Sequence, residues 1–201
     1  MVSGSPERAR EVPVRSLDAP LEYPLVVDLD GTLVNADTLW LAFGKLALFK
    51  PYRAIWAVAQ IPLGRARFKQ AVANGLVLDV SKLPYRRNLL EMVKAERARG
   101  RRIILATGAD RSCAIRVANH LQCFDVILAS DGEKNLTGTR KAAAIETLFG
   151  GGPFIYAGDS RDDLAVWRKS AGAILVGASR SCSLEVERAG IPVCLNFPPV
   201  R

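Results

Sequence analysis

Histidine is almost absent from this sequence, and its cysteines are not arranged in pairs. His120 is the only histidine, which excludes a metal site made of several imidazole ligands and speaks against a Ser-His-Asp triad. The cysteines show no C-x-x-C spacing and no secretory signal precedes them, so we expect reduced, mostly packed thiols in a cytoplasmic protein. These cysteines are Cys113, Cys123, Cys182 and Cys194.

Long apolar runs are also missing. Residues 1–22 mix Ser, Pro, Arg and Glu without the apolar core of a signal peptide, and we expect them to form a flexible leader outside the fold. Residues 38–49 and 54–63 are apolar, but each run is far shorter than the roughly 20 residues that span a bilayer. The sequence therefore predicts no transmembrane hairpin there.

Acidic side chains are absent between Thr38 and Leu78, although basic side chains are frequent there. The whole chain has a formal net charge of +8, which favours an anionic partner such as a phosphorylated substrate or an anionic membrane surface. The sequence shows no RRM, zinc finger or similar module, so we expect no nucleic-acid partner. The basic residues of this stretch are Lys45, Lys50, Arg53, Arg65, Arg67 and Lys69.

Aromatic side chains are interleaved with these cations. The combination suits a surface that touches anionic lipid, which would place the protein at the inner face of a membrane. The alternative is a set of amphipathic helices packed on their own core with solvated basic residues, as is common in globular proteins. The aromatic residues are Trp40, Phe43, Phe49, Trp56 and Phe68.

Two carboxylates follow a short apolar run. Residues 25–27 are Leu-Val-Val, which predicts a strand buried on both faces, and Asp28 and Asp30 follow, with Gly31 next. Carboxylates at the carboxyl end of a parallel strand lie where open α/β sheets bind their ligands. The alternative is that Asp-Leu-Asp-Gly is merely a turn, because Asp and Gly are common in turns.

Paired carboxylates of this kind suit phosphoryl transfer. One carboxylate can attack phosphorus and form an aspartyl phosphate, and the other can protonate the leaving alkoxide and later activate water. An anionic nucleophile repels a phosphate unless a cation bridges them, and Mg²⁺ prefers such oxygen ligands. We therefore expect a magnesium-dependent active site at Asp28 and Asp30.

The remaining sequence alternates predicted helices and strands, which indicates an α/β fold with a parallel sheet. Three helical segments come first, at residues 38–49, 54–63 and 65–76, with residues 50–53 separating the first two. The later predicted helices are residues 84–99, 110–122, one opened by Lys141, and 181–189. The later predicted strands are residues 103–108, 124–130, 154–157, 172–177 and 191–196.

Four motifs in this order resemble those of the haloacid dehalogenase (HAD) superfamily. DLDGT at residues 28–32 is similar to the first motif, and the strand that ends in Thr107-Gly108 is similar to the second. The third motif is a lysine at a helix start, which favours Lys141 over the alternative, Lys134. The fourth resembles G-D-S-x-x-D, with Asp159 and Asp163 as its carboxylates and Asp162 as the less favoured alternative to Asp163.

The resemblance implies a role for each matching residue. Asp28 is the expected nucleophile and Asp30 the general acid and base, while Thr107, the Gly108 backbone N–H and Lys141 are expected to hold the phosphoryl group. The implied Mg²⁺ ligands are Asp28, Asp159 and the backbone carbonyl of Asp30. Asp163 would hold a water on the metal or orient Lys141. HAD dehalogenases lack the second aspartate of the first motif, so Asp30 points to phosphoryl transfer.

The resemblance also implies a domain organisation. It predicts a Rossmann-like, doubly wound parallel sheet with a small helical cap inserted after the first strand. Residues 23–34 and 81–201 would form the core and residues 35–80 the cap, which in this superfamily shields the site and shapes substrate choice.

A narrower similarity links three stretches to the HAD domain that is often fused to UbiA-type polyprenyltransferases. The stretches are residues 83–111, 128–138 and 156–167. We therefore expect a Mg²⁺-dependent phosphomonoester hydrolase that acts on a prenyl-pathway or lipid-linked phosphate. Two alternatives remain: an accessory module that docks on a membrane prenyltransferase, and a HAD phosphotransferase or mutase.

Overall fold

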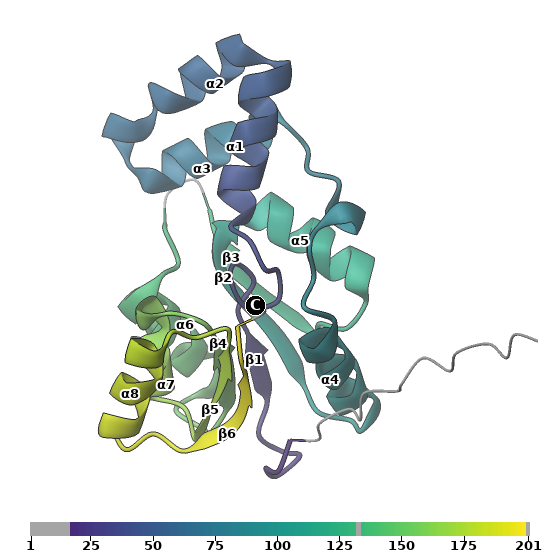
Figure 1. Ribbon diagram of the computed structural model, residues 1–201, viewed down its shortest axis with the longest axis vertical. Coiled ribbons are helices and arrows are strands. Elements are labelled where there is room, and N and C mark those ends of the chain that lie inside the picture. The colour runs from purple at the N-terminus through teal and green to yellow at the C-terminus, as the bar shows by residue number, and fades with distance from the viewer. Residues whose placement is uncertain (1–16, 132–133, 200–201) are drawn as a thin grey trace, which may run out of the picture.

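The computed structural model describes residues 17–131 and 134–199 and contains one sheet of parallel strands (Figure 1). The strand order is β3-β2-β1-β4-β5-β6, so the first strand lies in the middle and the chain changes its winding direction between β1 and β4. This confirms the expected doubly wound α/β fold. The strands are β1 (Leu25–Val27), β2 (Ile103–Asp110), β3 (Val126–Ser130), β4 (Ile155–Gly158), β5 (Gly172–Val176) and β6 (Val193–Phe197).

Helices cover both faces of the sheet. Alternate residues of a strand point to opposite faces, and β1 shows this directly. Leu25 and Val27 pack in one apolar layer with α4 (Arg87–Ala98) and α5 (Arg111–Leu121). Val26 packs in the other layer, together with α6 (Gly138–Phe149), α7 (Leu164–Trp167) and α8 (Arg180–Arg188). A strand buried on both faces needs the unbroken apolar run that the sequence provides.

The helical segment after the first strand lies at one end of the longest axis of the molecule, beyond the carboxyl ends of the central strands (Figure 1). It comprises α1 (Thr38–Phe49), α2 (Pro51–Val58), the 3₁₀ turn η1 (Ile61–Leu63) and α3 (Arg65–Gly75). The predicted separation of two helices by residues 50–53 is reduced to Lys50, and the helix predicted at residues 54–63 instead ends at Val58, before η1. Pro51 is the first residue of α2, because a proline has no N–H to leave unpaired at a helix start.

The predicted range of the leader, residues 1–22, was too long, because its last residues belong to the fold. Residues 1–16 lie outside the described residues, but Leu17 is buried, with 2% of its surface exposed. The buried guanidinium of Arg101 donates hydrogen bonds to the backbone carbonyls of Ala19, Pro20 and Tyr23. Arg101 also pairs with the buried Glu96 at 2.7 Å. These bonds fix a segment that has no apolar periodicity of its own.

One further boundary differs from the prediction because tertiary hydrogen bonds override local preference. The helix expected from Pro84 begins only at Arg87. The Asn35 N–H donates to the Pro84 carbonyl, and the Arg86 N–H donates to the Leu33 carbonyl, so the chain stays extended there. A 3₁₀ turn, η2 (Val80–Lys82), precedes this stretch. Across the described ranges, no helix combines the length and apolar character needed to cross a bilayer.

Candidate active site

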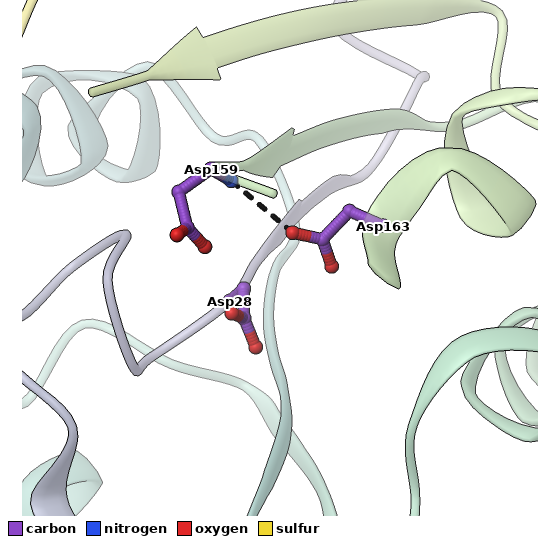
Figure 2. Close-up of side chains that lie close together, drawn as sticks. All are labelled: Asp28, Asp159 and Asp163. Carbon is purple, nitrogen blue, oxygen red and sulfur yellow. Dashed lines mark hydrogen bonds between the residues drawn. The ribbon is translucent and has the colours of Figure 1, made fainter. Parts of the chain in front are cut away.

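Three carboxylates meet where the winding direction of the sheet changes. Asp28 directly follows β1, and Asp159 directly follows the neighbouring β4. Asp163 ends the 3₁₀ turn η3 (Arg161–Asp163). One oxygen from each carboxylate can be chosen so that all three lie within 4.8 Å of one another. Figure 2 shows the three side chains converging on a common space. The sequence therefore brings together residues that are up to 135 positions apart.

The residues after Asp28 position Asp159. The Thr32 hydroxyl donates to Asp159 Oδ1 at 3.1 Å. Gly31 has a φ of 76°, and a Cβ there would lie 2.3 Å from Asp159 Oδ2. Glycine is required at this position because both the backbone conformation and the space exclude a side chain.

Asp163 is held by backbone and side-chain donors. Its Oδ2 accepts the N–H groups of Asp159 at 3.1 Å and Ser160 at 3.4 Å, and the first of these bonds is drawn in Figure 2. Its Oδ1 accepts the Tyr156 hydroxyl at 2.6 Å. A Cβ on Gly158 would lie 2.6 Å from Asp163 Oδ2, so this glycine also makes room for a carboxylate.

Lys141, in the first turn of α6, brings a positive charge to these carboxylates. Its buried Nζ lies 2.8 Å from Asp28 Oδ1, 3.1 Å from Asp163 Oδ1 and 2.9 Å from the Tyr156 hydroxyl. Burial acts to lower the Lys141 pKa, but Asp28 and Asp163 together raise it above its ordinary value. The ammonium therefore stays charged. The exposed alternative, Lys134, donates its backbone N–H to Asp131 Oδ1 at 2.6 Å.

Two of these carboxyl groups have raised pKa values. Burial raises the pKa of Asp28 to about 8, against the pull of Lys141, and Asp163 adds to the rise. Burial and Asp163 raise the pKa of Asp159 to about 6. Carboxyl groups that share a buried site bind protons more tightly, because protonation removes the repulsion between their negative charges. A divalent cation can replace those protons, so the donor set of hard oxygens fits Mg²⁺.

Asp30 lies apart from these three carboxylates. Its Oδ1 accepts the backbone N–H of Thr38 at 2.7 Å, which ties the end of β1 to the start of α1. Burial raises the pKa of Asp30, although the bond from Thr38 opposes the rise. A raised pKa keeps a carboxyl group protonated to a higher pH, which suits a proton donor.

The residues of the expected second motif differ in exposure. Thr107 is fully buried, and its Oγ1 accepts the Ala109 N–H at 2.9 Å. Gly108 lines the cavity above the carboxylates. A Cβ on Gly108 would lie 2.7 Å from the methyl group of Thr137, so glycine allows the close approach of β2 and the start of α6.

The cavity has a volume of about 390 Å³ and lies between the sheet and the helical segment. Lys69 of α3 crosses this space and donates to the Gly108 carbonyl at 2.6 Å and to Asn135 Oδ1 at 2.8 Å. The sheet side contributes Asp28, Asp30, Gly108, Lys141 and Asp159 to the wall. The helical segment contributes Leu39, Trp40, Ile61, Arg65, Phe68 and Lys69.

Two residues of the site were not predicted from the sequence: Tyr156, whose hydroxyl contacts Lys141 and Asp163, and Lys69, which lines the cavity. In the sequence, Tyr156 looks like any aromatic residue of a buried strand. The one signal is that a buried tyrosine hydroxyl needs a hydrogen-bond partner. Lys69 was one of six cations without acidic neighbours in the sequence. Its direction toward the site depends on how α3 packs, which no local pattern encodes.

Comparison with known proteins now identifies the family. The model of the haloacid dehalogenase-like hydrolase family matches residues 25–168. The chain therefore belongs to the haloacid dehalogenase-like hydrolases. A curated relative, the uncharacterized protein y4nM of Sinorhizobium fredii (strain NBRC 101917 / NGR234), is 35% identical over 188 residues. That alignment covers 93% of this chain but only 36% of y4nM.

Solved structures show the same fold at low sequence identity. A protein of unknown function from Bordetella pertussis Tohama I superimposes with a TM-score of 0.66 at 14% identity, covering 86% of this chain and 97% of that one. A substrate-bound phosphoserine phosphatase superimposes with a TM-score of 0.58 at 15% identity, covering 88% of this chain and 93% of that one. At these identities the likeness extends to the fold alone.

Proposed function

We propose that the protein is a Mg²⁺-dependent phosphomonoester hydrolase that forms an aspartyl phosphate on Asp28. The observation that carries the proposal is the 2.8 Å contact between Lys141 Nζ and Asp28, at the base of a cavity that both the sheet and the helical segment line. A carboxylate held beside a fixed cation suits attack on an anionic phosphoryl group.

The carboxylates fit a magnesium ion. Asp28 and Asp159, with the backbone carbonyl of Asp30, would be its ligands, and Asp163 would hold a metal-bound water or orient Lys141. The proximity of Asp28, Asp159 and Asp163 supports this assignment, as do the raised pKa values of Asp28 and Asp159. When bound, the ion would offset the negative charge of the nucleophile and the phosphoryl group.

The chain's own residues would carry out two displacements. Asp28 attacks phosphorus, and the bond from phosphorus to the leaving oxygen breaks as Asp30 gives that oxygen its proton. Asp30 then takes a proton from water, whose oxygen attacks phosphorus and frees Asp28 and inorganic phosphate. The raised pKa of Asp30 supports its role as the acid of the first step.

Three groups would hold the phosphoryl oxygens during both steps. These are the Thr107 hydroxyl, the Gly108 backbone N–H and the Lys141 ammonium. Thr107 Oγ1 accepts a bond from Ala109, which leaves its own O–H able to donate. The lysine neutralises charge that develops on the phosphoryl group, and such preorganised donors supply much of an enzyme's rate enhancement.

The wall of the cavity supports a substrate with an apolar body. Trp40, Ile61 and Phe68 line it beside the cations Arg65 and Lys69. We therefore propose residues 35–80 as a cap that selects the substrate, and a lipid-linked or prenyl phosphate as the substrate class. The prenyltransferase partner stays a prediction from the narrower resemblance.

Release of phosphate from p-nitrophenyl phosphate tests the proposed reaction. The wild-type protein should turn over with Mg²⁺ and not with excess EDTA, and Asp28→Asn should abolish turnover. Asp18→Asn is the matched control, because Asp18 is an exposed aspartate outside the cavity wall. Turnover by Asp28→Asn at the wild-type rate would overturn the proposal. A substrate series with lengthening prenyl chains should then show kcat/KM rising with chain length.

A further inference from the structure

Helix α2 buries small residues and exposes large apolar ones, the reverse of an ordinary surface helix. Its two buried residues are the small Ala54 and Ala57, which face α1 and α3 in the apolar core of the helical segment. Its large apolar residues face outward, with 72% of Ile55 and 57% of Trp56 exposed. A surface helix usually places its largest apolar residues inward. The outer face of α2 is therefore suited to an apolar environment that the isolated chain does not provide.

This outer face forms part of a larger surface, which we call the apolar tip. Tyr52, Ile55 and Trp56 follow the i, i+3, i+4 spacing and share one side of α2. The end of α1 adjoins it and adds Leu48 and Phe49, which are 75% and 69% exposed. We define the apolar tip as Leu48, Phe49, Tyr52, Ile55 and Trp56. Figure 1 shows α2 at the end of the molecule farthest from most of the sheet.

The exposed charged residues of the helical segment that carries the apolar tip are basic. Lys45, Arg53 and Arg67 are exposed on the same helical segment, and the Arg53 guanidinium lies 5.9 Å from the centre of the Tyr52 ring. The sequence has no acidic residue between Thr38 and Leu78. Exposed aromatic and aliphatic side chains edged by cations match the interface of an anionic bilayer, where each cation near the surface adds to the attraction.

We propose that the apolar tip docks on the surface of a bilayer that contains anionic phospholipid. Docking would be peripheral, because none of the described helices can span a membrane. Trp40 and Ile61 are exposed on the same helical segment and also line the cavity, so this segment carries both the apolar tip and part of the cavity wall. This interaction does not depend on the proposed reaction.

A second copy of the chain fits this surface less well. An isologous dimer would place the same surface of each protomer against the other. Cations would then face cations with no acidic residue of this segment to balance them, and like-charge contacts oppose association. A bilayer with anionic headgroups supplies the missing negative charge.

Vesicle co-sedimentation tests the proposal. The full chain should bind vesicles of phosphatidylcholine with about one third phosphatidylglycerol, should bind vesicles of phosphatidylcholine alone at least about tenfold less tightly, and should be released by salt. The double variant Ile55→Ser, Trp56→Ser should lose at least about tenfold in affinity, because both side chains leave the apolar interface. Leu184→Ser is the matched control, since Leu184 is an exposed apolar residue of α8.

Tryptophan fluorescence gives a second readout on the same vesicles. Trp40 and Trp56 are exposed, whereas Trp167 is fully buried. Binding should shift the emission to shorter wavelength, and Trp56→Phe should reduce the shift while the variant still sediments. Absence of binding to either vesicle would overturn the proposal, as would a dimer in sedimentation velocity that Ile55→Ser, Trp56→Ser dissociates. Asp28→Asn should bind vesicles like the wild type, which separates this result from the test of catalysis.

Discussion

Lys141 Nζ bridges Asp28 and Asp163, at 2.8 Å from Oδ1 of the first and 3.1 Å from Oδ1 of the second. One ammonium thus offsets two buried carboxylates that belong to different loops. Tyr156 completes the arrangement by donating to Asp163 at 2.6 Å. Lys141 is therefore the cation that offsets the charge of Asp28 and Asp163.

Replacement of Lys141 by methionine should therefore impair both activity and stability. Loss of the charge leaves two buried carboxylates without their partner, which costs about 3–5 kcal/mol in the free energy of unfolding. The rate constant kcat should fall by about 10²–10³. Lys134→Met is the control and should change neither quantity, because the Lys134 side chain is exposed. Equal effects of the two variants in urea unfolding and phosphate release would contradict this assignment.

The raised carboxyl pKa values predict a pH dependence of stability. The pKa of Asp28 rises from the ordinary 3.8 to about 8, so the metal-free folded protein binds a proton that the unfolded chain releases above about pH 4. Its free energy of unfolding should fall as the pH rises from 4 to 8.

Magnesium must displace that proton, so its affinity should rise over the same range. Titration calorimetry should give an affinity for Mg²⁺ at least about tenfold higher at pH 8 than at pH 6. Asp28→Asn should bind Mg²⁺ more weakly and with less dependence on pH. An affinity for Mg²⁺ that is the same at both pH values would show that these carboxyl groups are already ionised.

Gly31→Ala should disrupt the site without removing any functional group. The new Cβ would lie 2.3 Å from Asp159 Oδ2, on a backbone with a φ of 76°. We expect at least about 1 kcal/mol of destabilisation and a loss of Mg²⁺ binding as Asp159 is displaced. Gly44→Ala is the control, because Gly44 lies in α1 with nothing within 4 Å of a Cβ. That change should stabilise the protein by up to about 1 kcal/mol.

Arg101→Gln should release the segment at residues 17–23. The guanidinium holds three backbone carbonyls of that segment and pairs with Glu96. Limited proteolysis should cut there faster than in the wild type, and the free energy of unfolding should fall by about 3–5 kcal/mol. Arg102→Gln, at an exposed neighbour, should leave the cleavage rate unchanged.

Local patterns in the sequence predicted much of this fold. The apolar run before Asp28 predicted the central strand, and Thr38–Phe49 was predicted with the bounds that α1 has. The start of α4 was missed because Leu33 and Asn35 bond the backbone at Pro84 and Arg86. The burial of Leu17 was missed because it depends on Arg101 and Glu96, about 80 residues away.

The candidate site was likewise predicted only in part. Asp28, Asp159 and Asp163 could be predicted together from the motifs that resemble those of the superfamily, and Asp28 and Asp159 directly follow neighbouring parallel strands. The contacts of Lys69 with Gly108 and Asn135 could not, because they depend on the packing of the helical segment over the sheet. The outward direction of Ile55 and Trp56 is equally a property of that packing.

In the proposed mechanism, Asp28 carries the phosphoryl group during turnover. Borohydride reduction of the enzyme, quenched during hydrolysis with Mg²⁺, converts an aspartyl phosphate to homoserine, which peptide mass spectrometry locates. We expect homoserine at position 28 in the wild type and none in Asp28→Asn. Homoserine at another aspartate, or none at all in an enzyme that accumulates its intermediate in a burst, would contradict this mechanism.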